Sequence, residues 1–149
     1  MDFLAHSPEP TEPLLGRWEL ETLAMRPVVL DDALSALERT FSFVKRDRFV
    51  ARLCLDESIT NACEHSELEK SGPVVVSLYA DSQGWVLRVR DQGRGFVAEE
   101  IDDGIDGDVL SERGRGLAIL DGYAERMVVA EEGREVTVWL RVSQEESTR

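Results

Sequence analysis

The stretch that most constrains this chain is residues 53–65, Leu-Cys-Leu-Asp-Glu-Ser-Ile-Thr-Asn-Ala-Cys-Glu-His, which contains neither proline nor glycine. It predicts a helix, on which positions four apart lie one above the other, about 6 Å apart. Glu57 and Asn61 then share one face, which Cys54 and His65 continue. Because neighbouring positions on this side are largely apolar, the carboxylate and the carboxamide would lie beside the core, where unpaired polar groups are costly. Their partners are either a bound cation with ordered water or a neighbouring loop.

The composition is that of an ordinary globular chain, with 149 residues, 42% hydrophobic and 32% charged. We expect one domain over residues 14–142, a flexible proline-containing arm over 1–13 and a polar tail over 143–149. No apolar run is long enough to span a bilayer and no signal segment begins the chain, so a cytoplasmic protein is expected. Cys54 and Cys63 would lie about 13 Å apart on one helix, beyond disulfide reach, and are read as reduced core residues.

The formal net charge is −13, from 17 basic and 30 acidic residues. Such a surface repels nucleic acid and anionic membranes, so neither is an expected partner. Protein partners fit the charge better. A small anionic ligand is still compatible with it, provided that backbone amides and a few arginines are focused locally.

The first half of the chain has a strand pattern followed by two helical segments. Residues 17–24 predict an edge strand, and the apolar residues after Pro27 recur at helical spacing as far as Val44. Residues 45–47 are read as a basic break before the central helix, which is expected over 48–66. The Ser-Gly-Pro at 71–73 forbids its continuation.

From Val74 the hydrophobic period changes to two, which predicts a hairpin of residues 74–80 and 85–89. Asp91 continues the phase of the second strand, so its side chain is expected on the buried side. Residues 96–113 are acidic and glycine-rich, and a loop of this length is usually functional or disordered. A short helix is expected after 114–116, then a second hairpin over 126–131 and 135–142. The order predicts an α+β fold, a two-layer sandwich with helices on one face of a mostly antiparallel sheet.

Three features belong together: Glu57 with Asn61, Asp-Gln-Gly-Arg-Gly at 91–95, and Arg-Gly-Arg-Gly-Leu at 113–117. Each alone is weak, but their order and placement resemble the ATP-binding fold of gyrase, a class of heat-shock chaperones, histidine kinases and mismatch-repair proteins. The resemblance runs from about residue 48 to residue 142. Within that group, the compact size and residues 57–65 look like the bacterial anti-sigma-factor serine kinases. That family commonly has Gly-Thr before the last strand, where this chain has Gly133 and Arg134.

The resemblance implies ATP and Mg²⁺ as cofactors and assigns roles that the residue chemistry fits. Asp91 would accept a hydrogen bond from the adenine amino group, the alternative being a carboxylate that caps the glycine turn. Gly93 and Gly95 would let the backbone approach the base and ribose. Asn61 carries an oxygen suited to Mg²⁺, and Glu57 would act as the catalytic base for the attacking hydroxyl or water.

The second glycine box would hold the phosphates. Gly114 and Gly116, expected at a helix start, would offer free amides beside the positive end of the helix dipole. Arg113 or Arg115 would neutralise the triphosphate, the alternative being a solvent-exposed arginine. His65 is read as structural.

The resemblance predicts a regulatory serine/threonine kinase that binds a sigma factor, phosphorylates a serine of an anti-anti-sigma (STAS-domain) partner and forms a homodimer. The alternative is a nucleotide-gated binding switch with little or no phosphoryl transfer. A histidine kinase is disfavoured, because no helical hairpin with a phosphoacceptor histidine precedes the domain and His6 lies in the proline-containing arm.

Overall fold

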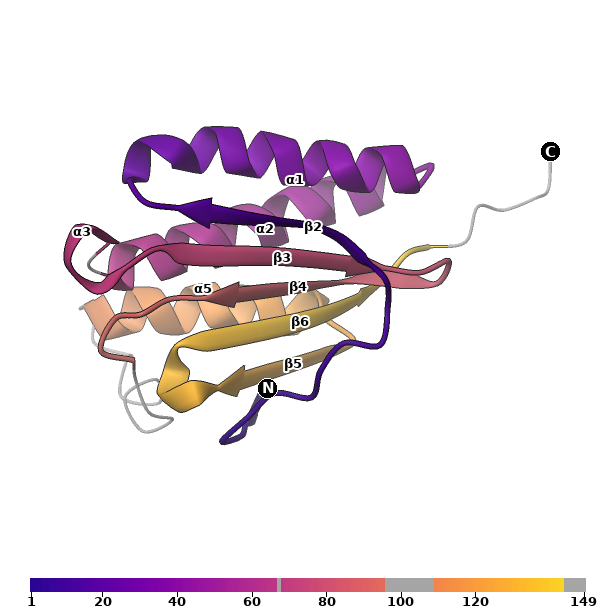
Figure 1. Cartoon of the computed structure of the whole chain (residues 1–149). Coiled ribbons are helices and arrows are strands. Elements are labelled where there is room, and N and C mark those ends of the chain that lie inside the picture. The colour runs from indigo at the N-terminus through magenta and orange to yellow at the C-terminus, as the bar shows by residue number, and fades with distance from the viewer. Residues whose placement is uncertain (67, 96–108, 144–149) are drawn as a thin grey trace, which may run out of the picture.

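The computed structural model describes residues 1–66, 68–95 and 109–143 (Figure 1). Its helices are α1 (Arg26–Thr40), α2 (Lys45–His65), α3 (Leu68–Ser71) and α5 (Val109–Tyr123). Its strands are β1 (Asp2–Phe3), β2 (Leu14–Leu20), β3 (Val74–Ala80), β4 (Gly84–Arg90), β5 (Arg126–Ala130) and β6 (Glu135–Arg141). Two short 3₁₀ turns, η1 (Leu23–Met25) and η3 (Glu131–Gly133), complete the described elements.

Within these residues the strands form one sheet in the order β1-β5-β6-β4-β3-β2. All neighbouring pairs are antiparallel except β1 with β5. The three long helices pack on one face of this sheet (Figure 1). The predicted α+β two-layer sandwich is therefore confirmed.

The core lies between the helices and the sheet, where every second side chain of a strand points toward the helices. Both predicted hairpins are confirmed, β3 with β4 and β5 with β6. Their inner faces supply fully buried side chains, which meet apolar residues of α1, α2 and α5: Val74, Val76, Leu78, Leu87 and Val138 from the sheet, and Leu37, Leu55, Ile59, Leu117 and Leu120 from the helices. Cys54 and Cys63 are free and buried on α2, as expected.

Two predicted boundaries are wrong. The edge strand is Leu14–Leu20 rather than 17–24, because the residues after Leu20 turn into η1. The basic break predicted at 45–47 is instead the first turn of α2, and the chain breaks at 41–44. Asp47 lies in that first turn, where an acidic group is favoured, and its carboxylate accepts hydrogen bonds from the backbone N–H and hydroxyl of Ser143 (2.8 and 2.9 Å).

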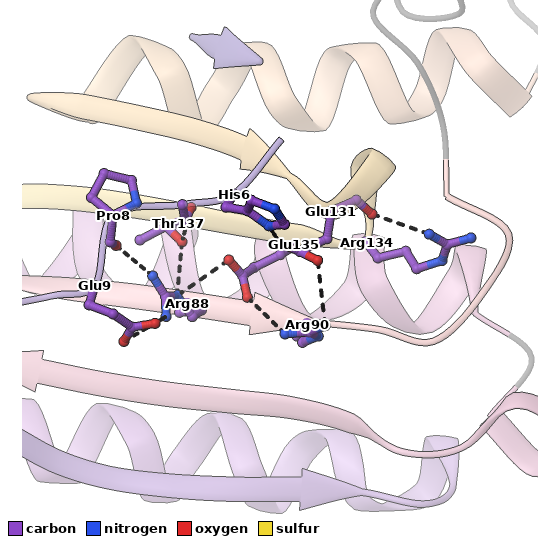
Figure 2. A network of polar contacts seen from close by, with 10 residues as sticks. His6, Pro8, Glu9, Arg88, Arg90, Glu131, Arg134, Glu135 and Thr137 are labelled. Carbon is purple, nitrogen blue, oxygen red and sulfur yellow. Dashed lines mark hydrogen bonds and ion pairs between the residues drawn. The ribbon is translucent and has the colours of Figure 1, made fainter. Parts of the chain in front are cut away.

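The segment predicted as a flexible arm is placed in contact with the sheet. Asp2 and Phe3 pair with β5, and the chain then crosses the face opposite the helices, where Arg88 of β4 donates to the Pro8 carbonyl (2.8 Å, Figure 2). On the same face Ser7 bonds Thr137 of β6 (3.2 Å). These contacts were not foreseeable from an arm with three prolines. The predicted tail lies outside the described residues from 144 onward.

Candidate active site

Helix α2 places Glu57 and Asn61 one turn apart, and both side chains are half-buried. Within the described part of the chain, neither side chain forms a hydrogen bond or an ion pair. The interpretation that a neighbouring loop satisfies them therefore finds no support among those residues. A carboxylate and a carboxamide that are half-buried without such partners form an arrangement that fits a ligand.

The surroundings of Glu57 favour its protonated form more than water does. Burial raises the pKa of the Glu57 carboxyl, and the neighbouring charges of Asp56 and then Glu64 raise the pKa further. Helix α5 limits the space on its other side: a Cβ atom at Gly116 would lie 3.3 Å from Glu57 Oε2. A carboxyl group with a raised pKa and little room to move has the properties expected of a general base.

Asp91 follows β4 and is 7% exposed, which confirms its predicted burial. Its backbone N–H donates to the carbonyl of Arg134 (2.8 Å), and its Oδ1 accepts from the N–H of Gly93 (2.8 Å). The turn-capping interpretation is therefore correct for this oxygen. The Asp91 charge also raises the pKa of the Cys63 thiol on α2, after the larger effects of burial, which raises it, and of Arg26, which lowers it.

The two glycines of this loop have structural roles of their own. Gly95 has φ +75°, in the left-handed region, and a Cβ there would collide with the Glu132 carbonyl oxygen. The carbonyl of Gly93 accepts a hydrogen bond from Arg134 Nε (2.7 Å). Gly95 is thus required by the close approach of two protein segments, in addition to any approach to a base or ribose.

The helix start predicted at 114–116 is wrong. Helix α5 begins at Val109, so Gly114 and Gly116 lie beyond the first four residues, whose amides are the ones left unpaired at a helix N-terminus. Free amides and the dipole end therefore do not support a phosphate cradle at these two glycines, and their role in binding remains a prediction. Arg115 is exposed. The side chain of Arg113 and residues 96–108 of the loop predicted over 96–113 lie outside the described residues. Residues 109–113 of that predicted loop are instead the start of α5.

Sequence reasoning missed Arg134, although its side chain holds the loop that carries Asp91. Besides the bond to Gly93, its Nη2 donates to the Arg94 carbonyl (3.5 Å) and its Nη1 to the Glu131 carbonyl (3.3 Å, Figure 2). The available signal was the arginine that follows Gly133, a position where the kinases that residues 57–65 resemble commonly have threonine. A long side chain there is able to reach a neighbouring loop.

Among the described residues, no group of three or more His, Cys, Asp and Glu side chains is placed to hold a metal ion. Asn61 nevertheless fits Mg²⁺, because its carboxamide makes no hydrogen bond within that part of the chain. This ion usually takes one or two protein oxygens and completes its shell with phosphates and water. The donor set is therefore compatible with a metal that arrives with a nucleotide.

The chain belongs to the histidine kinase-like ATPase domain family, whose model matches residues 21–142. This match spans α1, α2, the loop beyond β4, α5 and β6, and membership supports ATP binding and an ATP-using activity of the kinase-like type. No curated protein matches the chain. None of the helices in the described residues is long and apolar enough to span a membrane.

Proposed function

We propose that this protein is a cytoplasmic ATP-Mg²⁺-dependent serine/threonine kinase that acts as an anti-sigma factor and phosphorylates a serine of a STAS-domain anti-anti-sigma partner. The family match supports the ATP-using part, and the sequence of residues 57–65 supports the finer assignment. The observation that carries the chemistry is the pair Glu57 and Asn61, half-buried on one face of α2, with Glu57 against α5.

In this proposal Glu57 accepts the proton of the attacking seryl hydroxyl. The seryl oxygen forms a bond to the γ-phosphorus of ATP, and the bond from that phosphorus to the bridging oxygen breaks to release ADP. A carboxylate whose pKa is raised by burial is a stronger base than one in water, so the environment of Glu57 suits this step. Asn61 would hold Mg²⁺, which when bound neutralises charge on the phosphates. Asp91 would accept a hydrogen bond from the adenine amino group.

The proposed partners are proteins: a sigma factor, the phosphorylated STAS-domain protein and a second copy of this chain in a homodimer. The net charge of −13 supports protein rather than nucleic-acid or membrane partners, because a strongly acidic surface repels polyanions. Sedimentation at micromolar concentration tests the homodimer, and a monomer with and without nucleotide would contradict it.

The kinase is tested with labelled ATP and the proteins that the tagged chain captures from its source cells. Glu57→Gln should keep ATP affinity and lower phosphate transfer by ~10²–10⁴-fold, the usual contribution of a general base. Asn61→Ala should lose both metal-dependent binding and transfer. Asp32→Asn, at an exposed position of α1, serves as the matched control and should stay within a few-fold of the parent.

Calorimetry separates binding from chemistry. Asp91→Asn should weaken ATP binding by about 1.5–3 kcal/mol, the value of a hydrogen bond to a charged group. If the parent binds ATP and transfers phosphate to no captured protein, the chain is the nucleotide-gated switch instead. If the parent transfers phosphate and Glu57→Gln does so at the same rate, Glu57 is not the base.

A further inference from the structure

We propose that Arg134 is a positioning residue that holds the Asp91 loop in the conformation that selects ATP over GTP. This inference rests on the proposed nucleotide-binding function and adds to it a residue that sets base specificity. It is carried by the contacts of Arg134, which join the end of β4 to the start of β6.

Arg134 contacts the Asp91 loop through both its main chain and its side chain. Its carbonyl accepts from the Asp91 N–H (2.8 Å), while its guanidinium donates to the carbonyls of Gly93 (2.7 Å) and Arg94 (3.5 Å). Asp91, Gly93 and Arg94 of the loop are therefore all tied to one residue.

Arg134 is itself fixed by the turn that precedes β6. Its N–H and Nη1 both donate to the Glu131 carbonyl (3.2 and 3.3 Å). Glu131 and Glu132 have φ of 54° and 57°, an unusual left-handed conformation for glutamate, and Gly95 packs directly on the Glu132 carbonyl. The turn thus contacts the Arg134 guanidinium through the Glu131 carbonyl and the Asp91 loop through the Glu132 carbonyl.

This geometry acts on Asp91 through Gly93. The Gly93 N–H reaches Asp91 Oδ1 (2.8 Å) while Arg134 holds the carbonyl of the same glycine. The N–H and the carbonyl of Gly93 belong to the two peptide groups on either side of its Cα, so releasing the carbonyl would loosen the backbone at Gly93. The N–H would then hold the buried carboxylate in place less firmly. An ionised carboxylate only accepts hydrogen bonds, so it pairs with the 6-amino group of adenine and repels the 6-oxo group of guanine. A fixed Asp91 discriminates between the two bases more strongly than one that is free to turn.

The guanidinium suits this task because its donors form a rigid planar fork that reaches two carbonyls at once. Lysine keeps the charge but offers a compact ammonium on a flexible stem. Arg134→Lys should therefore restore only part of what Arg134→Ala loses. Arg141→Ala is the matched control, because Arg141 ends β6, the strand that follows Arg134, and its side chain pairs with Glu125, away from the loop.

The first measurement is calorimetric affinity for ATP and for GTP. Arg134→Ala should weaken ATP binding about tenfold and leave GTP binding nearly unchanged, so the ATP/GTP ratio falls about tenfold. Arg134→Lys should lie between Arg134→Ala and the parent, and Arg141→Ala should match the parent. If Arg134→Ala does not fold, the comparison of Arg134→Lys with Arg141→Ala decides the question. An unchanged ratio in the Arg134 variants of a parent that binds ATP would overturn the specificity role.

The second measurement needs no nucleotide. Hydrogen exchange at the Gly93 amide should be faster in Arg134→Ala than in the parent and unchanged in Arg141→Ala. Equal exchange in all three proteins would overturn the positioning role. A parent that fails to bind ATP would instead overturn the proposed function and the specificity role with it, while Gly93 exchange would still decide whether Arg134 positions the loop.

Discussion

The Glu57 carboxylate lies against Gly116, where an added Cβ atom would be 3.3 Å from Oε2. This contact joins α2 to α5 at the proposed base. At that distance a methyl group would force the carboxylate to move by a few tenths of an ångström. The absence of a side chain at residue 116 therefore helps to set where Glu57 lies.

Gly116→Ala should raise stability or leave it unchanged and lower phosphate transfer. Alanine is favoured over glycine inside a helix by about 1 kcal/mol. Displacing a catalytic group by 1 Å costs about 10²-fold in rate, so a smaller shift should cost up to about tenfold. Gly122→Ala is the control on the same helix, because a Cβ there meets nothing within 4 Å. Equal transfer rates in the two variants would contradict the contact's role.

The pH dependence of stability should reveal the environment of Glu57. Its pKa is raised in the folded protein from the ordinary 4.5, so the folded state binds this proton more tightly than the unfolded state does. The ionised carboxylate therefore lowers stability at neutral pH, and this cost disappears as pH falls below 4.5. The melting temperature of Glu57→Gln should be higher than that of the parent at pH 7, and the difference should disappear near pH 4. A difference that is constant with pH would contradict the shift.

The two thiols should be unreactive in the native protein. Burial raises the pKa of Cys54 to about 12 and that of Cys63 to about 11, and the thiolate is the reacting form. Ellman's reagent at pH 8 should label neither in the native state and both in denaturant. Cys63→Ala assigns any partial signal to one position. If two thiols per chain react rapidly without denaturant, these cysteines are not buried in solution.

Deleting residues 1–9 should lower the free energy of unfolding by at least about 1.5–3 kcal/mol, the value of one hydrogen bond to a charged group, because the pairing of β1 with β5 is lost as well. The side chain of Arg88 is only 12% exposed, and the deletion removes its acceptor, the Pro8 carbonyl. Glu9→Ala is the control. The Glu9 side chain is 85% exposed and its ion pair with Arg88 is at the surface, so this change should stay within about 0.5 kcal/mol. Urea unfolding of the three proteins gives the comparison, and equal stabilities would contradict a structural role for the segment.

The sequence was most informative where one physical pattern dominated. Period-two alternation predicted both hairpins, and helical spacing predicted α1 and α2, because burial on one face imposes these periods. It failed at the start of α5, where glycines and acidic residues resemble a loop although the segment from Val109 is helical. It also failed at residues 1–9, whose contacts with Arg88 and Thr137 are long-range and leave no local pattern.

The same distinction holds for the site. The half-burial of Glu57 and Asn61 and the burial of Asp91 were predictable, because helical spacing and strand phase fix which way these side chains point. The contact of Arg134 with the Asp91 loop was not predictable, because its hydrogen bond reaches Gly93, which is 41 residues earlier in the chain.

Pairing of Asp2 and Phe3 with Val128 and Val129 also covers part of the backbone of β5, so that only the two-residue β1 stands at this edge of the sheet. An unpaired edge is a template on which other chains add strands and aggregate. The opposite edge, β2, is less suited to such growth, because its register is shifted between Leu14 and Gly16. Proteolytic trimming of the first residues would therefore uncover the backbone of β5, and the protein's resistance to aggregation would depend on an intact N-terminus.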